Sequence, residues 1–154
     1  MADALAEAGP NVSLWSWTPD ETSGFWARRQ ANETAMHRFD AQLAAGETQP
    51  IEHLLAVDGI NELFELIPFW PLGDRVRGTG ETLHFHCTDG DGEWLVQLGT
   101  DALVVTREHA KGDVAARGTA SDLLLFLYGR VDVDRLDVFG DGSLLTRWRE
   151  LVTW

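Results

Sequence analysis

The chain has 154 residues, 44% of them hydrophobic, which is enough for one domain with a core and room for a small appendage. Its 25 acidic and 12 basic residues give a formal net charge of −13, which disfavours nucleic acid and anionic membrane surfaces as partners. With a single cysteine, no apolar run near the roughly 18 residues of a membrane span and no secretion signal, we expect a cytoplasmic protein.

The signals for a long helix, Thr18–Ala45, come first along the chain. Thr18 can cap its N-terminus, and Pro19 suits the first helical position because the N–H that proline lacks is not needed there. Gly46 can take the left-handed conformation that ends a helix. A second helical pattern follows at Ile51–Ile67, where apolar residues recur at helical spacing.

A change of periodicity after about residue 70 predicts a sheet. Turn-forming residues without a period fill residues 68–80, and alternation of apolar and polar residues then begins at Thr82–Thr88. Asp89–Gly92 is typical of a hairpin turn, which leads into a return strand. The remaining strand patterns are Trp94–Leu98, Ala102–Arg107 and Val114–Arg117.

Two C-terminal helices are predicted after the strands, one ending at Tyr128 and one starting at Asp141. The fold class is therefore α+β, with N-terminal helices followed by an antiparallel sheet of about four strands packed against two C-terminal helices. We expect a helical segment over residues 1–70 and an α+β domain over residues 71–154.

Glu33 and His37 are the first candidates for a site, because a spacing of four residues points both side chains to one side of a helix. They are either metal ligands or a surface ion pair, and two ligands alone are too few for a zinc site. His84 and His86, on one face of a strand, either add ligands or form a polar sheet face. The other two histidines, His53 and His109, have no partner nearby in the sequence and are expected to be exposed.

Cys87 and Arg130 also carry reactive groups at defined positions. Cys87 lies on the apolar side of its strand with Leu83 and Phe85, which predicts a buried side chain rather than a nucleophile. Arg130 follows a predicted helix end, where a guanidinium either bonds the last carbonyl groups or binds a carboxylate substrate or thiol cofactor. The sequence leaves both alternatives open for Arg130.

Four stretches together closely resemble actinobacterial proteins of the mycothiol-dependent maleylpyruvate isomerase family: GFWARRQANETAMHRFDAQLAAG, LAVDGINELFELIP, ETLHFHCTDGDGEWLVQL and GRVDVDRLDVFGD. The resemblance covers nearly the whole chain from about Leu14. It implies an N-terminal DinB-like four-helix bundle that holds a divalent metal, usually zinc, and a C-terminal α+β domain. The family's site takes a Glu and a His from the last bundle helix, so the resemblance implies Glu33 and His37 as metal ligands.

The resemblance also implies a chemistry with its cofactors and partners. In this family the metal holds the thiol of mycothiol as a thiolate, which adds to maleylpyruvate, permits rotation and leaves to give fumarylpyruvate. The partners implied are a low-molecular-weight thiol and a small organic acid substrate. An arginine of the C-terminal domain takes part in catalysis, and Arg130 is the candidate for it, with Arg117 as the alternative.

Part of the family's architecture has no counterpart in this sequence. The helices that precede the last bundle helix and the first His ligand are missing, so we expect a truncated or short family member that is inactive as a lone chain. Trp15, Trp17 and Trp26 cluster around a helix whose apolar stripe would ordinarily pack on those helices. We therefore expect a homodimer, or an assembly with exchanged helices, in which the stripe is covered.

The C-terminal half is also similar to sterol-carrier-protein-2-type domains, over Leu123–Asp141 in particular. This similarity implies an alternative function, a noncatalytic module that binds a small hydrophobic ligand in an apolar cavity. Four apolar residues either line such a cavity or fill a solid core: Leu124, Phe126, Leu127 and Trp148.

Overall fold

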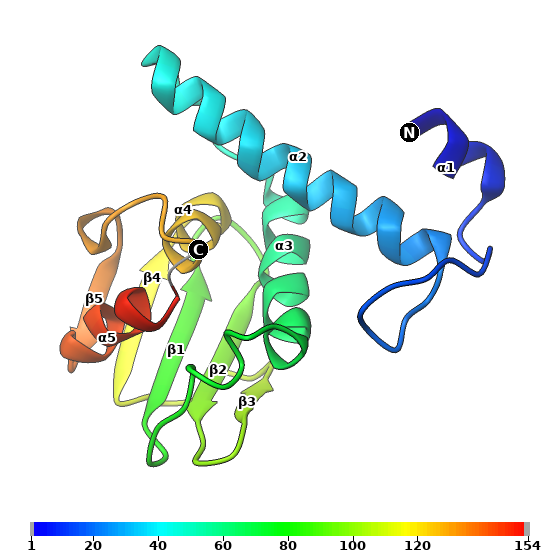
Figure 1. The fold of residues 1–154 in the computed structure, drawn as a ribbon. Coiled ribbons are helices and arrows are strands. Elements are labelled where there is room, and N and C mark those ends of the chain that lie inside the picture. The colour runs from blue at the N-terminus through cyan, green and yellow to red at the C-terminus, as the bar shows by residue number, and fades with distance from the viewer. Residues whose placement is uncertain (1, 153–154) are drawn as a thin grey trace. The chain divides into compact units, whose positions relative to one another are not determined.

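The structure is a computed structural model that describes residues 2–152, and it divides into two compact units, Met1–Gln49 and Pro50–Trp154. No helix within residues 2–152 is both long and apolar enough to cross a membrane. The first unit contains the helices α1 (Ala2–Ala8) and α2 (Ser23–Ala45). The helices of the second unit are α3 (His53–Leu66), α4 (Ala120–Leu127) and α5 (Ser143–Leu151), with the 3-10 turns η1 (Ile67–Phe69) and η2 (Val133–Arg135). Its strands are β1 (Thr82–Cys87), β2 (Glu93–Leu98), β3 (Leu103–Thr106), β4 (Val114–Gly118) and β5 (Asp137–Gly140), as Figure 1 shows.

Helix α2 ends at the predicted residue but begins later than predicted, at Ser23. Thr22 is its N-cap, and the Thr22 hydroxyl oxygen accepts a hydrogen bond from the N–H of Phe25 at 3.1 Å. Thr18 instead belongs to a tight loop, in which its N–H donates to Oγ of Ser16 at 3.0 Å. A Ser or Thr side chain can serve a turn as well as a helix start, so the capping pattern at Thr18 does not distinguish the two.

The sheet of the second unit has five strands in the order β3-β2-β1-β4-β5. Strand β1 pairs antiparallel with β2 and parallel with β4. The α+β class and the sheet packed against two C-terminal helices are confirmed. The sheet differs from the predicted arrangement of about four antiparallel strands by this parallel pair and by β5, an exposed four-residue edge strand too short to show an alternation.

The parallel pair results from a crossover, residues 107–113, between β3 and β4. Strands β1 and β3 run in the same direction because both pair antiparallel with β2. The crossover returns the chain to the start of β1, where the N–H of Asp113 donates to the carbonyl of Thr82 at 3.0 Å. The Asp113 carboxylate also accepts from the N–H of Thr82 at 2.8 Å. Strand β4 therefore starts beside the start of β1 and runs parallel to it.

One face of the sheet packs on helices. The ring of Phe85 in β1 lies 6.4 Å from that of Phe64 in α3 and 6.3 Å from that of Trp148 in α5. Because successive side chains of a strand point to opposite faces, His84 and His86 on either side of Phe85 point away from these helices. The helix-covered face thus contains the core, and the opposite face carries the histidines.

Candidate functional site

Four polar side chains gather on the sheet face that lies opposite the helices. His84 and His86 come from β1, and Glu93 of β2 is the cross-strand partner of His86 in the antiparallel register. His109 belongs to the crossover and reaches the same place. Each residue offers one ligand atom, and the four atoms lie within 4.8 Å of one another. This imidazole cluster is the one such group of three or more His, Cys, Asp or Glu residues in the part of the chain that the structure describes.

Glu93 lies at the centre of the imidazole cluster. Its Oε1 atom is 2.7 Å from Nδ1 of His109 and also contacts Nδ1 of His86. The same oxygen is 3.7 Å from Nε2 of His84, which is too far for a hydrogen bond. Hydrogen bonds from His109 and His86 lower the pKa of the Glu93 carboxyl, although partial burial opposes them. The carboxylate is therefore held ionised among three imidazole rings.

His84 is the buried member of the imidazole cluster. The residue is 6% exposed, and its Nε2 atom has no hydrogen-bond partner among the described residues. Burial lowers the pKa of His84; the Glu93 charge opposes this shift, while His109 and His86 add to it. His84 is therefore favoured as a neutral imidazole, the form that ligates metals.

The position of His109 in this cluster was not predicted from the sequence. Its side chain is 82% exposed, as expected, yet it has a partner in Glu93, 16 positions earlier in the chain. The crossover makes this contact, and no short-range pattern announces it. The alternation of His84 and His86 was the available signal for a site on this face.

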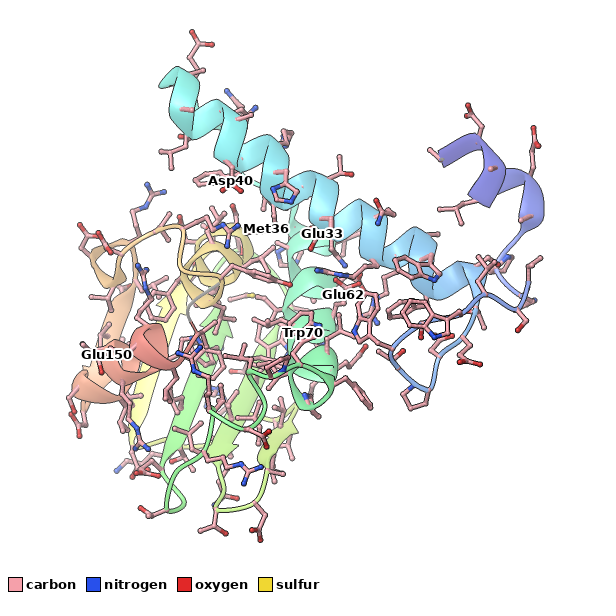
Figure 2. The ribbon with its side chains drawn as sticks, in the orientation of Figure 1. Glu33, Met36, Asp40, Glu62, Trp70 and Glu150 are labelled. Carbon is pink, nitrogen blue, oxygen red and sulfur yellow. The ribbon has the colours of Figure 1, made fainter. Side chains whose placement is uncertain are left out.

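Glu33 and His37 lie together on α2, as their spacing predicts. Nε2 of His37 is 3.2 Å from Oε2 of Glu33, while Nδ1 of His37 is 3.3 Å from the Asp40 carboxylate. Arg29 contacts the other carboxylate oxygen of Glu33. Glu33 and Asp40 both project from α2 in Figure 2. Their role as metal ligands stays a prediction.

Arg130 and Arg117 occupy different surroundings within the second unit. Nη1 of Arg130 donates to the carbonyl of Tyr128 at 2.9 Å, and its guanidinium lies 5.9 Å from the centre of the Tyr128 ring. This contact fits the capping alternative for Arg130, while its catalytic role stays a prediction. Arg117 is exposed on β4, opposite Asp137 of β5 in the register.

Cys87 is buried on the helix-covered face of β1, as predicted. Burial, assisted by the negative charge of Asp89, raises the pKa of its thiol to about 12. A thiol with such a pKa is protonated at neutral pH, which disfavours it as a nucleophile.

A pocket of about 320 Å³ lies between α3 and the edge of the sheet formed by β2 and β3. Arg107 stands at this pocket with its guanidinium 5.1 Å from the centre of the Trp94 ring. Asn61 accepts hydrogen bonds from Arg107 at 2.7 Å and from Nε1 of Trp94 at 2.8 Å. The remaining lining residues are Phe64, Glu65, Leu103 and Val105. The pocket thus combines apolar walls with two charged side chains, the cationic Arg107 and the anionic Glu65.

Comparisons with known proteins identify two parts of the chain. The family model "MDMPI C-terminal domain" matches residues 55–147, and "Mycothiol maleylpyruvate isomerase N-terminal domain" matches residues 1–42. No protein of curated function matches the chain significantly.

Several solved structures align with part of the chain. A double mutant of the sec-alkyl sulfatase PisA1 aligns with 61% of this chain at 19% identity and a TM-score of 0.51, and the chain spans 16% of the sulfatase's length. The UbiJ-SCP2 ubiquinone synthesis protein aligns with 64% of this chain and 93% of its own, at 17% identity and a TM-score of 0.47. The sterol carrier protein domain 2 of Helicoverpa armigera aligns with 63% of this chain and 88% of its own, at 16% identity and a TM-score of 0.40.

Proposed function

Because the chain belongs to the mycothiol maleylpyruvate isomerase family, we propose that it takes part in thiol-dependent isomerase or transferase chemistry with a divalent metal and mycothiol. A small organic acid is the substrate class, with maleylpyruvate as the family's example. The observation that supports the proposal most directly is the pairing of Glu33 with His37 on α2, 3.2 Å apart. Two donor atoms this close together can bind the same metal ion.

The neighbours of this pair suit metal binding. Metal-ligating histidines commonly donate their second ring N–H to a carboxylate, which fixes the tautomer and orients the ring. Asp40 stands 3.3 Å from Nδ1 of His37 and can accept that proton, which leaves the lone pair of Nε2 for an ion. Arg29 contacts Oε1 of Glu33, so Oε2 remains on the side of His37. The arrangement resembles the outer shell of a metal site around two ligands.

The donor set on α2 is incomplete by itself. A catalytic zinc site needs three protein ligands and an open position. Asp40 does not supply the third ligand, because it faces Nδ1 of His37, the ring nitrogen that points away from Glu33. When bound, zinc would hold the cofactor thiol as a thiolate. Glu33 and His37 would hold the ion, and Arg130 would orient the carboxylate of the substrate. We propose that a lone chain is inactive and that a second copy in a homodimer contributes the missing ligand.

The experiment is metal analysis of the purified chain with two matched double variants. The Glu33→Ala/His37→Ala variant should lose the zinc ion that this pair binds. It should also lose all thiol-addition activity of the assembled protein. Glu47→Ala/His53→Ala removes the same two residue types outside the pair, and it should keep both. Equal zinc content in the two variants would overturn the proposed role of Glu33 and His37.

A second candidate function, a noncatalytic module for a small hydrophobic ligand, is supported by the pocket beside α3. Its volume of about 320 Å³ lies at the lower end of the range for small-molecule sites. It is not lined by the apolar residues first considered, which are buried: Leu124, Phe126, Leu127 and Trp148. An amphiphilic ligand would place its carboxylate at Arg107 and its chain against Phe64.

Decanoate titrated into isotope-labelled protein tests this second candidate. The indole N–H resonance of Trp94 should shift, because Trp94 lines the pocket. Arg107→Leu should weaken the effect, whereas Arg117→Leu, at an exposed position of β4, should leave it unchanged. Shifts spread over the surface without Trp94 would exclude the pocket as the binding site.

A further inference from the structure

We propose that His84, His86, Glu93 and His109 form a binding site for a divalent transition-metal ion, with Zn²⁺ as the expected occupant. The site is separate in residues and in structural unit from the Glu33 and His37 pair. Three imidazole nitrogens and one carboxylate oxygen are donors that suit Zn²⁺ and its transition-metal neighbours, whereas Ca²⁺ and Mg²⁺ prefer oxygen alone.

The donor atoms are already close to a ligation geometry. They lie within 4.8 Å of one another. In a tetrahedral site with metal–ligand bonds of about 2.1 Å, the donor atoms lie about 3.4 Å apart, so side-chain movements that bring the most distant donors about 1.4 Å closer close the site. Three of the four donors sit on the paired strands β1 and β2, where the register places His86 opposite Glu93. Paired strands hold side chains more firmly than loops, which favours a preorganised site.

His84 supplies an independent observation. A buried polar atom without a hydrogen-bond partner is costly and calls for a compensating contact. Nε2 of His84 is such an atom, and it faces Glu93 at 3.7 Å, beyond hydrogen-bond range. A metal ion bound between them would satisfy both the nitrogen lone pair and the carboxylate.

The surroundings allow an ion to enter. His109 is 82% exposed, so the site is accessible to solvent on the side of the crossover. The formal charge of −13 attracts cations to the protein. Ligation by His109 would also fasten the crossover to the sheet, so an occupied site should reduce the mobility of residues 107–113.

The competing explanation is a hub of hydrogen bonds with no ion, in which Glu93 simply accepts from His86 and His109. In that case Zn²⁺ alone, added to the full chain, would not compete for the imidazole nitrogens. The two explanations therefore differ in a direct binding measurement.

The test is titration of the full chain with Zn²⁺, followed by calorimetry and by the imidazole ¹⁵N resonances of the five histidines. In the wild-type chain, resonances of His84, His86 and His109 should shift at low zinc concentration, and that of His53 should not. His109→Asn should weaken binding by more than about tenfold, because loss of even an outer-shell partner costs roughly 10- to 100-fold. His109 is exposed, so this variant should fold normally. His53→Asn is the control outside the cluster; contrary to expectation, the side chain of His53 is only 23% exposed, with Nδ1 3.3 Å from the Asp89 carboxylate.

The Glu33→Ala/His37→Ala variant separates this inference from the proposed function. If it still binds one Zn²⁺ through the imidazole cluster, the inference stands, whether or not Glu33 and His37 bind a metal. If Zn²⁺ shifts only His37, or if His109→Asn and Glu93→Gln bind as tightly as the wild type, the inference is overturned. Absence of any zinc binding at micromolar concentration overturns it as well.

Discussion

Helix α2 and the strand pair β1–β2 bring potential metal ligands together in different ways. On α2, Glu33 and His37 meet at 3.2 Å because residues four apart share a side of a helix. On the sheet, His86 meets Glu93 through strand register, and His109 arrives through the crossover. Local geometry thus yields two donors, and long-range pairing yields four. The larger donor set is the one that the sequence alone does not predict.

The largest expected effect concerns the difference in access between the two faces of β1. The helix-covered face should be closed to reagents and ions, whereas the opposite face should be open to them. Cys87, on the covered face, has its thiol pKa raised from 9.0 to about 12 by burial. The native thiolate population, and hence the rate of reaction with a disulfide reagent at pH 8, should fall by about a thousandfold. Urea should restore the rate of a free thiol. Rapid labelling of the native protein would mean that the two faces do not differ in access.

The crossover can be broken by adding one methyl group. A Cβ on Gly112 would lie 2.7 Å from the carbonyl oxygen of Val114 and 3.0 Å from the backbone nitrogen of His84. These are backbone atoms that cannot move aside easily, so Gly112→Ala should lower the free energy of unfolding by about 1–3 kcal/mol. It should also weaken Zn²⁺ binding at the imidazole cluster without affecting the α2 pair.

Gly142→Ala is the control for this variant. Its added Cβ would find its nearest neighbour, a Val138 methyl group, at an ordinary distance of 3.7 Å. Urea unfolding curves of the two variants and the wild type measure the difference. Equal stability of the two variants would show that the crossover tolerates displacement and does not fix the position of His109.

A substitution at the N-cap of α2 tests whether the contact between Glu33 and His37 depends only on the nearby turns of the helix. The hydroxyl of Thr22 accepts from the N–H of Phe25, and Thr22→Ala should cost about 1 kcal/mol of helix stability. Because Glu33 lies 11 positions further along α2, its pairing with His37 should persist. Amide hydrogen exchange should therefore rise in the first turn alone. Thr48→Ala, at an exposed position after the helix, is the matched control; increased exchange throughout α2 would contradict the local view.

The sequence predicted the features that depend on local periodicity. Alternation identified β1 and its two faces, and helical spacing identified α2, α3 and the pairing of Glu33 with His37. Local periodicity did not predict which way β4 would run, because a parallel and an antiparallel neighbour of β1 show the same alternation. The helical pattern of α3 likewise does not predict that Phe64 packs on Phe85 of the sheet.

The imidazole cluster combines both situations. His84 and His86 were candidates because they are two residues apart on a strand, whereas Glu93 and His109 had no such relation to them. Their contact depends on strand register and on the route of the crossover. A site whose members come from three separate segments can be proposed from a sequence only after its strand pairing is known.

The smallest expected effect concerns the anchor that starts β4 beside β1. The backbone N–H and the hydroxyl of Thr82 donate to the Asp113 carboxylate and lower its pKa below 3.8. A carboxyl whose pKa is lowered in the folded state adds stability above its unfolded pKa and loses this contribution as pH falls through the lowered value. Wild type should therefore exceed Asp113→Asn in stability at pH 7, and the difference should shrink as pH falls below about 3.8. Asp101→Asn, in an exposed turn, is the control, and a difference that stayed constant with pH would show that the Asp113 charge does not hold the crossover in place.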